Sequence, residues 1–286
     1  SRILIYLLLT VAVYLTILFS AVSPRMLFKA VSGPNAAEKK IQEFSIASPY
    51  QRTATKIRVL LPDNFRPDKR YPVLYVLPSV PQLMDPWWNS GMIEVVRLDV
   101  ANRFDVICVA PTFSDMPWYA DHPTDPGIRQ ESYFLKTVVP FVDENFPTIA
   151  DGWGRYLLGY SKSGTGAFTL MLRYPDMFRR ALSWDAPLKF DFAAVPGAEL
   201  KKIYGTEENF LKYHIPALLE EKAPHLRGGP PRFVLMGYSD NKKAIDDDHR
   251  MFDHFGIPHI FDNTTASAHQ WHSGWFHRAV EYLLAD

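Results

Sequence analysis

The chain has 286 residues, and its 31 Lys and Arg residues are balanced by 31 Asp and Glu residues, so the formal net charge is zero. A neutral chain lacks the basic excess that a long phosphate footprint requires, and we therefore expect no nucleic-acid partner. Hydrophobic residues make up 47% of the sequence, which is typical of a globular protein and excludes a disordered or fibrous one. The single cysteine, Cys108, excludes an internal disulfide, a Cys-rich zinc site and an N-terminal lipoprotein anchor.

Near the N-terminus, residues 3–22 form an uninterrupted run of 20 uncharged, mostly apolar residues. At about 1.5 Å per helical residue this run spans roughly 30 Å, the thickness of the hydrocarbon core of a bilayer. Residues 1–23 are therefore predicted to form a transmembrane anchor, with a cleaved signal segment as the alternative. Either segment predicts a membrane-anchored or exported protein. Basic residues lie on both sides of the run, so the side of the membrane stays open.

Residues 24–43 are rich in Pro, Gly and polar residues, which is typical of a linker. Residues 44–286 are predicted to form one α/β domain, because short apolar runs alternate with helical patterns. The expected strands are 56–61, 71–77, 106–110, 155–159, 181–184, 232–236 and 259–261, and the expected helices are 92–100, 131–144, 164–173, 242–255 and 275–284. This alternation predicts a mostly parallel sheet with helices on both faces. Residues 195–226 interrupt it and are predicted to form a cap-like insertion.

Ser161 lies in the motif Gly159-x-Ser161-x-Ser163, directly after an apolar strand and before a helix that begins with small residues. This is the setting of a nucleophile elbow, in which a serine is held in a strained turn between a strand and a helix. The amide of Lys162, at the start of that helix, is the expected donor to a developing oxyanion.

A serine nucleophile needs a base and an orienting acid, and in hydrolases that carry such an elbow these follow the serine along the chain in the order acid, then histidine. Asp240 comes just after the predicted strand 232–236, and His269 follows 29 residues later, beyond one more helix and strand. Ser161, Asp240 and His269 are therefore the predicted catalytic triad. The alternatives for the acid are Asp185 and the run Asp246, Asp247 and Asp248, and the alternative for the base is His272. No spacing of histidines typical of a metal site is present, so neither a metal nor a cofactor is expected.

From about residue 58 to the end, the sequence resembles the putative-esterase family, which includes esterase D, feruloyl, acetyl and enterochelin esterases and mycolyltransferases. The matching stretches include Arg70-Tyr-Pro-Val-Leu-Tyr-Val-Leu77, Trp118-Tyr-Ala-Asp121, Gly159-Tyr-Ser-Lys-Ser-Gly164, Tyr174-Pro-Asp-Met-Phe178, Gly237-Tyr-Ser-Asp240 and His269-Gln-Trp271. The resemblance implies an α/β-hydrolase fold and a serine enzyme that acts on esters or transfers acyl groups.

Members of this family usually carry His-Gly after the strand that ends here at Leu77, whereas this sequence reads Pro78-Ser79-Val80-Pro81. Proline has no backbone N–H, so only the amide of Ser79 or Val80 can be the second oxyanion donor. Aromatic residues gather on the loops expected at the carboxyl ends of the strands and are candidates for a substrate-binding cleft. They are Trp87, Trp88, Trp118, Tyr119 and Trp271.

These observations predict a serine esterase that hydrolyses a small-molecule or glycan ester through an acyl-enzyme on Ser161. An acyltransferase of the same fold and a catalytically inactive anchored binding module remain as alternatives. The residues do not predict the acyl group, the alcohol or the oligomeric state.

Overall fold

The computed structural model describes residues 40–286, except for residues 85–89, 187, 194–196, 238–240, 265 and 286. The predicted anchor, residues 1–23, and nearly all of the predicted linker lie outside the described residues. Among those that are described, no helix is both long and apolar enough to cross a membrane. The residues from Lys40 onward form one compact unit.

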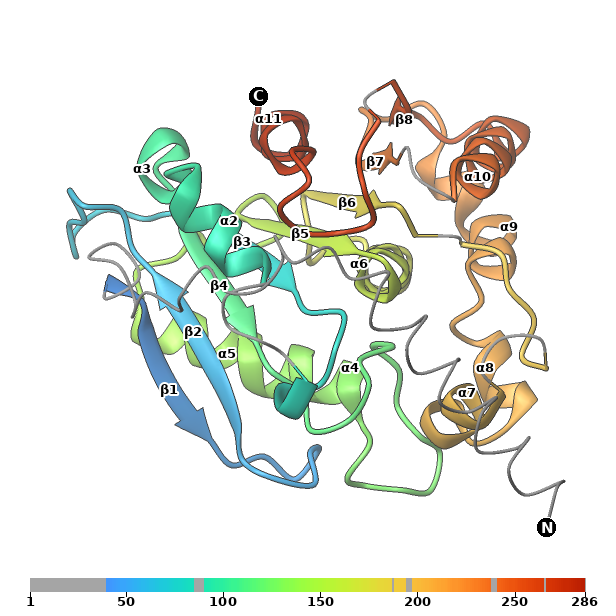
Figure 1. Ribbon diagram of the computed structural model, residues 1–286, viewed down its shortest axis with the longest axis horizontal. Coiled ribbons are helices and arrows are strands. Elements are labelled where there is room, and N and C mark those ends of the chain that lie inside the picture. The colour runs from blue at the N-terminus through green and yellow to red at the C-terminus, as the bar shows by residue number, and fades with distance from the viewer. Residues whose placement is uncertain are drawn as a thin grey trace, which may run out of the picture. The chain divides into compact units, whose positions relative to one another are not determined.

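In the described part of the chain, eight strands form a single sheet in the order β1-β2-β4-β3-β5-β6-β7-β8 (Figure 1). The strands are β1 (Gln42–Ile46), β2 (Thr55–Leu60), β3 (Val73–Leu77), β4 (Ile107–Pro111), β5 (Arg155–Tyr160), β6 (Arg180–Trp184), β7 (Phe233–Met236) and β8 (His259–Asp262). β2 pairs antiparallel with both β1 and β4, and the strands from β3 to β8 are parallel to one another. The predicted mostly parallel sheet is therefore confirmed.

The edge strand β1 was not predicted. It includes Gln42 and Glu43, which the sequence analysis assigned to the linker. Its side chains are exposed or half-buried, so it lacks the continuous apolar run that marks the central strands.

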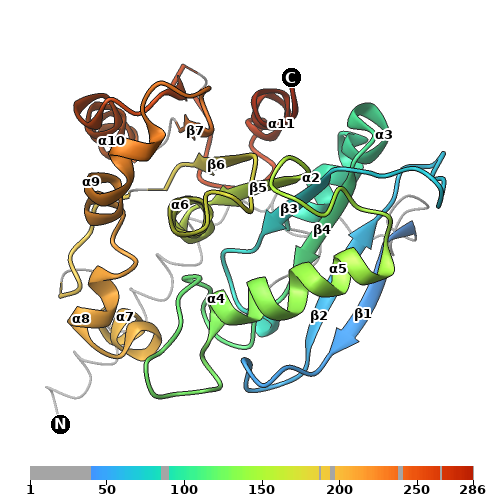
Figure 2. The ribbon, with the colours of Figure 1, turned by 180° about the vertical axis from the view of Figure 1, so that it is seen from behind.

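Helices cover both faces of the sheet, as predicted (Figures 1 and 2). On one face lie α2 (Gly91–Arg97), α3 (Val100–Phe104) and α11 (Phe276–Leu284). The other face is covered by α4 (Gln130–Tyr133), η5 (Phe134–Val138), α5 (Val139–Asn145), α6 (Lys162–Arg173), α9 (Ile215–Leu226) and α10 (Lys242–Phe255). Each central strand contributes side chains to the apolar cores on both faces of the sheet, since alternate residues point to opposite faces. In β3, for example, Val73 and Tyr75 enter one core and Leu74 enters the other.

The segment between β6 and β7 contains α7 (Gly197–Tyr204), α8 (Glu207–Leu211) and α9. The first two helices bury an apolar cluster against the loop that follows β4; its fully or nearly buried members are Trp118, Ala120, Ile128, Leu200, Ile203, Tyr204, Phe210 and Tyr213. α9 instead packs on α6 and α10 and serves as the crossover helix that two parallel strands require. The insertion is therefore α7 and α8, which is narrower than the predicted range.

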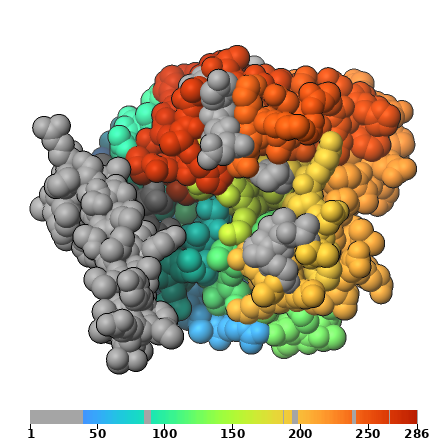
Figure 3. All heavy atoms as spheres, turned by 45° about the vertical axis from the view of Figure 1, so that its right-hand side comes forward, coloured from blue at the N-terminus to red at the C-terminus, as the bar shows by residue number. Residues whose placement is uncertain are grey.

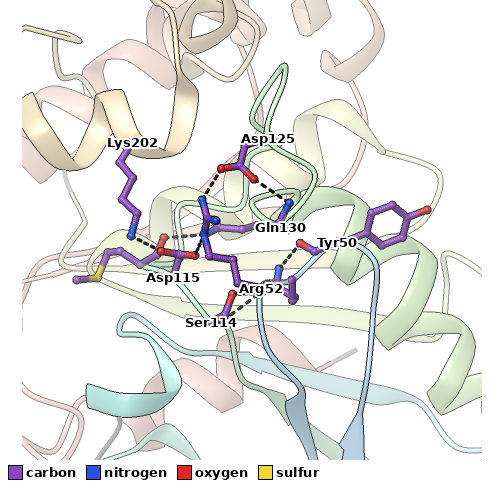
Figure 4. Close-up of polar contacts among 10 residues, drawn as sticks. Tyr50, Arg52, Ser114, Asp115, Asp125, Gln130 and Lys202 are labelled. Carbon is purple, nitrogen blue, oxygen red and sulfur yellow. Dashed lines mark hydrogen bonds and ion pairs between the residues drawn. The ribbon is translucent and has the colours of Figure 1, made fainter.

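A polar network joins the insertion to the rest of the domain (Figure 4). Arg52, in the connection between β1 and β2, lies 3.2 Å from the carboxylate of Asp115 and also pairs with Asp125. Lys202 of α7 pairs with the same Asp115, which is buried. The network ties together the β1–β2 connection, the loop after β4 and the insertion.

Candidate active site

Ser161 is the single residue between β5 and α6, and its backbone has φ 55° and ψ −130°. Positive φ is uncommon for a residue with a side chain, and such strain is found at functional sites. The turn requires glycine on both sides, because a Cβ atom on Gly159 would lie 2.1 Å from the Ser163 carbonyl oxygen and one on Gly164 would lie 2.6 Å from Ser183 Oγ. The local geometry is that of the nucleophile elbow that the sequence predicts.

Ser163 takes a position where a glycine is more usual, and its hydroxyl is accommodated inside the turn. Its Oγ accepts a hydrogen bond of 2.9 Å from the Tyr160 amide and donates one of 2.8 Å to the Tyr160 carbonyl. The side chain is fully buried and its polar atom is satisfied, so serine is compatible with the elbow here.

The register of the sheet brings Asp185 beside Ser161. Tyr160 of β5 pairs with Trp184 of β6, so the residues that follow these two strands emerge next to each other. The Ser161 amide donates a hydrogen bond of 3.0 Å to the Trp184 carbonyl across this pair. Asp185 is fully buried and has a positive φ of 50°.

His269, on the loop after β8, completes this arrangement. Its Nδ1 lies 2.5 Å from Oδ2 of Asp185, within hydrogen-bond distance of the carboxylate. The Tyr160 hydroxyl donates a hydrogen bond of 2.8 Å to the His269 carbonyl, and the two rings lie 4.6 Å apart. With Nδ1 engaged, the Nε2 atom of His269 is the nitrogen left to exchange a proton with a nucleophile.

Ser161 and His269 line the same cleft, which has a volume of about 310 Å³. Its other lining residues are Ser79, Val80, Met84, Tyr160, Lys162, Gln270 and Trp271. In Figure 3 the yellow-green atoms of the β5–α6 region lie in a hollow between the red atoms of the C-terminal segment and the yellow segment that follows β6. The cleft opens at the carboxyl ends of the parallel strands, where α/β sheets bind their ligands.

Asp240, the predicted acid, lies outside the described residues, so its role stays a prediction. In the described structure the Nδ1 atom of His269 is instead engaged by Asp185, an alternative that the sequence analysis kept open. The Asp246 carboxylate pairs with Lys242 at 3.2 Å. Asp248 is buried elsewhere, and the alternative base His272 is exposed.

The remaining alternative acid, Asp247, pairs with Lys243 at 2.9 Å on the surface of α10. Closer to the cleft, burial raises the pKa of the Tyr160 hydroxyl, and the negative charge of Asp185 raises it further. A buried carboxylate is stabilised when it is paired, and here its partner is the imidazole of His269.

The loop that follows β3 carries the two candidate oxyanion amides, Ser79 and Val80, into the cleft. The Tyr119 hydroxyl donates a hydrogen bond of 2.8 Å to the Pro78 carbonyl, and the Gln82 amide donates one of 2.8 Å to the Phe113 carbonyl. η3 (Gln82–Met84) follows directly. The loop is therefore held on both sides of its two amides, although it lacks the glycine of its relatives. Opposite it, the amide of Lys162 is the first of α6 and has no acceptor within the helix.

The predicted aromatic cleft residues have different positions. Trp271 lines the cleft, whereas Trp118 and Tyr119 are buried and have other partners. Trp118 Nε1 donates a hydrogen bond of 2.6 Å to Glu199 of α7, and Tyr119 holds the loop after β3. The positions of Trp118 and Tyr119 therefore differ from the predicted ones, in which both side chains contact the substrate. Trp87 and Trp88 lie outside the described residues.

Tyr160 is a site residue that the sequence analysis missed. Its ring packs against His269 and also lies 4.9 Å from the ring of Trp271, so it forms one wall of the cleft. The signal available in the sequence was its position directly before the serine of the elbow, at the end of a strand whose carboxyl end meets the ligand.

The chain was compared with family models, with related sequences and with solved structures. A family model described as "Putative esterase" matches residues 48–190, half of the chain. Esterase Rv1288 of Mycobacterium tuberculosis is 31% identical over 144 residues, which cover 49% of this chain and 31% of that protein. The protein YjcH of Bacillus subtilis is 25% identical over 144 residues, which cover 48% of this chain and 58% of YjcH. The match thus spans about a third of the mycobacterial relative.

Among solved structures, a ferulic acid esterase superposes with a TM-score of 0.67 at 22% identity, covering 86% of this chain and 96% of that chain. The S-formylglutathione hydrolase FrmB of Staphylococcus aureus superposes with a TM-score of 0.65 at 19% identity, covering 85% and 98% of the two chains. These similarities confirm the predicted α/β-hydrolase fold. Because the family model matches half of the chain, the chain belongs to the family described as "Putative esterase".

Proposed function

We propose that this protein is a serine esterase that hydrolyses a carboxylic ester through an acyl-enzyme on Ser161. The observation that carries the proposal is the 2.5 Å contact between His269 Nδ1 and Asp185 Oδ2, beside an elbow serine in the same cleft. Membership of the esterase family supports it.

In the proposed reaction, His269 Nε2 takes the proton of the Ser161 hydroxyl as Oγ attacks the ester carbonyl. The protonated imidazole then gives this proton to the leaving alcohol. A water molecule attacks the acyl-enzyme in the second half of the reaction, with His269 again acting as the base, and the acid product leaves.

Asp185 holds the imidazole in the tautomer that exposes Nε2 and stabilises the imidazolium formed during each half of the reaction. Its full burial supports this role, since a low-dielectric setting strengthens the interaction of the carboxylate with the charged ring. We propose Asp185, rather than Asp240, as the third member of the triad.

The negative charge that develops on the ester oxygen would be stabilised by the Lys162 amide and by one amide of the loop after β3, Ser79 or Val80. One such donor is worth roughly 3–4 kcal/mol of transition-state stabilisation. The fixed position of the loop supports this role, because donors that are already oriented cost no reorganisation during the reaction.

The substrate that suits the cleft is a small-molecule ester with an apolar acyl group. The cleft volume of about 310 Å³ lies at the small end of the range for ligand pockets, and Met84, Tyr160 and Trp271 supply apolar contacts in a lining that also contains polar groups. The ring of Trp271 also offers a stacking surface for an aromatic acyl group or for the sugar of a glycan ester.

The test is covalent labelling of the full chain with a fluorophosphonate probe, followed by peptide mass spectrometry. We expect the label on Ser161, and its loss in Ser161→Ala and in His269→Ala. Ser45→Ala, on the exposed edge strand β1, is the control that keeps the label. An unlabelled but folded wild-type protein would contradict the proposal and favour the inactive binding module. If the label is found, adding alcohol acceptors to an ester assay distinguishes hydrolysis from acyl transfer.

We also propose that residues 3–22 attach the protein to a membrane, because they form an uncharged run long enough to cross one. Extraction of cell membranes with alkaline carbonate tests this. An anchored chain stays in the pellet at its full mass, and replacing Leu8 and Val11 with Arg releases it. A shortened chain in the soluble fraction would indicate a cleaved signal segment instead.

A further inference from the structure

Two histidines and an aspartate meet at the edge strand β8, away from the cleft. His249 and Asp253 lie one turn apart on α10, and His259 is the first residue of β8. His259 pairs with Phe233, the first residue of β7, so the cluster lies at the amino ends of the parallel strands. The active site lies at the opposite, carboxyl ends of the strands, and β8 itself is roughly 10 Å long.

The potential ligand atoms of these three residues lie within 4.8 Å of one another. His249 Nδ1 and His259 Nε2 are 2.7 Å apart. The Asp253 carboxylate lies 3.4 Å from His249 Nε2 through Oδ2 and 4.0 Å from His259 Nε2 through Oδ1. Two imidazoles and a carboxylate thus gather at the surface, with His259 beside Nδ1 of His249 and the carboxylate beside its Nε2. Asp253 is exposed there, and the side chain of His259 is only 5% exposed.

Both imidazole rings are held in place by groups outside the cluster. His259 Nδ1 lies 2.8 Å from the Ile257 carbonyl oxygen, which can only accept a hydrogen bond. The proton of neutral His259 is therefore on Nδ1, and the lone pair of Nε2 points into the cluster. This arrangement, in which the second ring nitrogen donates to a backbone carbonyl, is common for histidines that bind metals. The ring of His249 stacks on Phe261, with centroids 4.0 Å apart and planes at 6°.

We propose that His249, Asp253 and His259 form a binding site for a divalent transition metal of the zinc type. The ligand atoms are His249 Nδ1, His259 Nε2 and one carboxylate oxygen of Asp253. Two imidazoles and one carboxylate suit Zn²⁺ and not Mg²⁺ or Ca²⁺, which prefer oxygen ligands. Three protein ligands leave the fourth tetrahedral position to water.

Without a metal, the short contact between the two imidazoles is a hydrogen bond from the Nδ1 proton of His249 to the lone pair of His259. Metal binding needs the Nδ1 lone pair, so the His249 proton must leave that nitrogen. In the neutral ring this proton is transferred to Nε2, which faces the Asp253 carboxylate, and the imidazole stays neutral. In the doubly protonated ring the Nε2 proton stays in place and the Nδ1 proton is released to solvent. The two nitrogens then separate slightly to admit the ion at about 2.0–2.1 Å from each.

The bound ion would join α10 to β8, the last strand of the sheet. Among the described residues β8 pairs with one strand, β7, so a metal link to the helix adds an attachment to that pairing. Its effect is on stability, because a ligand that binds only the folded state stabilises that state by mass action. The spacing His-x3-Asp-x5-His matches none of the usual zinc motifs, which is why the sequence analysis predicted no metal.

The experiment uses the full chain, prepared in mild detergent without an affinity tag and stripped with a chelator. Zn²⁺ is titrated in competition with a chromophoric chelator. We expect one site per chain with an affinity in the micromolar range or tighter, and a rise in the thermal unfolding midpoint when Zn²⁺ is present. His249→Gln and Asp253→Asn each remove one ligand and are expected to weaken binding at least about tenfold.

His254→Gln is the matched control, since His254 is an exposed histidine on the same helix and lies outside the cluster. It should bind Zn²⁺ as the wild type does and keep the zinc-dependent rise in midpoint. Thermal unfolding without metal shows whether each variant is folded. The proposal is overturned if the folded wild type binds no Zn²⁺ at 100 times the protein concentration, or if His249→Gln and His254→Gln bind it equally.

Discussion

The hydroxyl of Tyr119 donates a hydrogen bond of 2.8 Å to the carbonyl oxygen of Pro78. The ring of Tyr119 is fully buried against the first turns of α6, where a Cβ atom on Gly166 would lie 2.1 Å from it. Tyr119 therefore connects the two structures that supply the proposed oxyanion donors, the loop after β3 and the helix that follows Ser161. We regard it as a positioning residue and not as a substrate contact.

Replacing Tyr119 with Phe removes this hydrogen bond and keeps the ring. We expect kcat for a small ester to fall about tenfold with little change in KM, because loosening a donor costs less than the 10²- to 10³-fold loss that follows complete removal. Tyr133→Phe is the control, since the Tyr133 hydroxyl shares a buried bond of 2.7 Å with Thr55 and serves the core. Equal values of kcat in the two variants would contradict the positioning role.

A pair of conservative substitutions distinguishes the two candidate acids. Asp185→Asn leaves the shape of the side chain but no longer selects the correct tautomer of His269, so we expect kcat to fall about 10³- to 10⁴-fold, as the analogous change does in serine proteases. Asp240→Asn should change kcat by less than about threefold. Steady-state ester hydrolysis checks both. If Asp240→Asn is the inactive variant, the acid predicted from the sequence is the correct one.

Much of this fold can be read from the sequence, because buried parallel strands appear as short continuous apolar runs. The strands from β2 to β8 were each predicted to within two residues. The edge strand β1 was missed because its exposed side chains alternate with half-buried ones in a stretch that also resembles a linker. The division of the segment after β6 into an insertion and a crossover helix depends on packing between α9 and α6, which periodicity does not reveal.

Ser161 and His269 could be predicted from the sequence, whereas the proposed acid depends on information that the sequence does not carry. Ser161 is marked by a local turn that needs small neighbours, and His269 follows from the order of residues along the chain. The acid is defined by which strand end lies beside the imidazole. That depends on the pairing of Tyr160 with Trp184, which places Asp185 next to Ser161. The spacing of residues along the sequence suggests which strand ends could carry the acid, but it does not show how the strands pair and in which register.

The elbow offers a test of the close packing around Asp185. In Gly164→Ala the new methyl group would lie 2.6 Å from Ser183 Oγ and 2.7 Å from Ala186 Cβ. We expect a loss of about 1–3 kcal/mol in the free energy of unfolding, as for other overpacked sites, and a lower kcat because Ala186 adjoins Asp185. Gly229→Ala is the control, since the nearest atom to its added methyl is 3.9 Å away. Chemical denaturation and ester hydrolysis measure the two effects, and unchanged values in Gly164→Ala would contradict the packing.

A partly buried ion pair joins α4 to the end of α6. Arg173 Nε lies 2.5 Å from the carboxylate of Glu131, whose other oxygen accepts a hydrogen bond of 2.8 Å from the Tyr174 hydroxyl. Arg173→Met leaves the buried Glu131 without its cation, and we expect a loss of about 3 kcal/mol in the free energy of unfolding. The double variant Glu131→Leu with Arg173→Met should recover part of this loss, because it buries no unpaired charge. A double variant that is less stable than Arg173→Met would contradict this account.

We expect Asp248 on α10 to make the stability of the protein depend on pH. Burial raises the pKa of its carboxyl from an ordinary value of 3.8 to about 7, with a smaller contribution from the charge of Asp247, while its Oδ2 accepts a hydrogen bond of 2.9 Å from the Leu188 amide. Between about pH 4 and pH 7 the folded state therefore binds more protons than the unfolded state, so the free energy of unfolding falls as the pH rises. Above pH 7 this penalty is constant, at no more than about 4 kcal/mol.

Asp248→Asn keeps an oxygen that accepts from Leu188 and cannot ionise. We expect it to be more stable than the wild type at pH 8, with a difference that shrinks steadily as the pH is lowered toward 4. Urea denaturation of both proteins from pH 4.5 to pH 8 measures this difference and cancels the groups that titrate in common. Glu220→Gln, on the exposed face of α9, should show no such trend. A stability difference between wild type and Asp248→Asn that is the same at every pH would mean that the Asp248 carboxyl is not protonated in the folded state, and that the loop at Leu188 is held by an ordinary ionised acceptor.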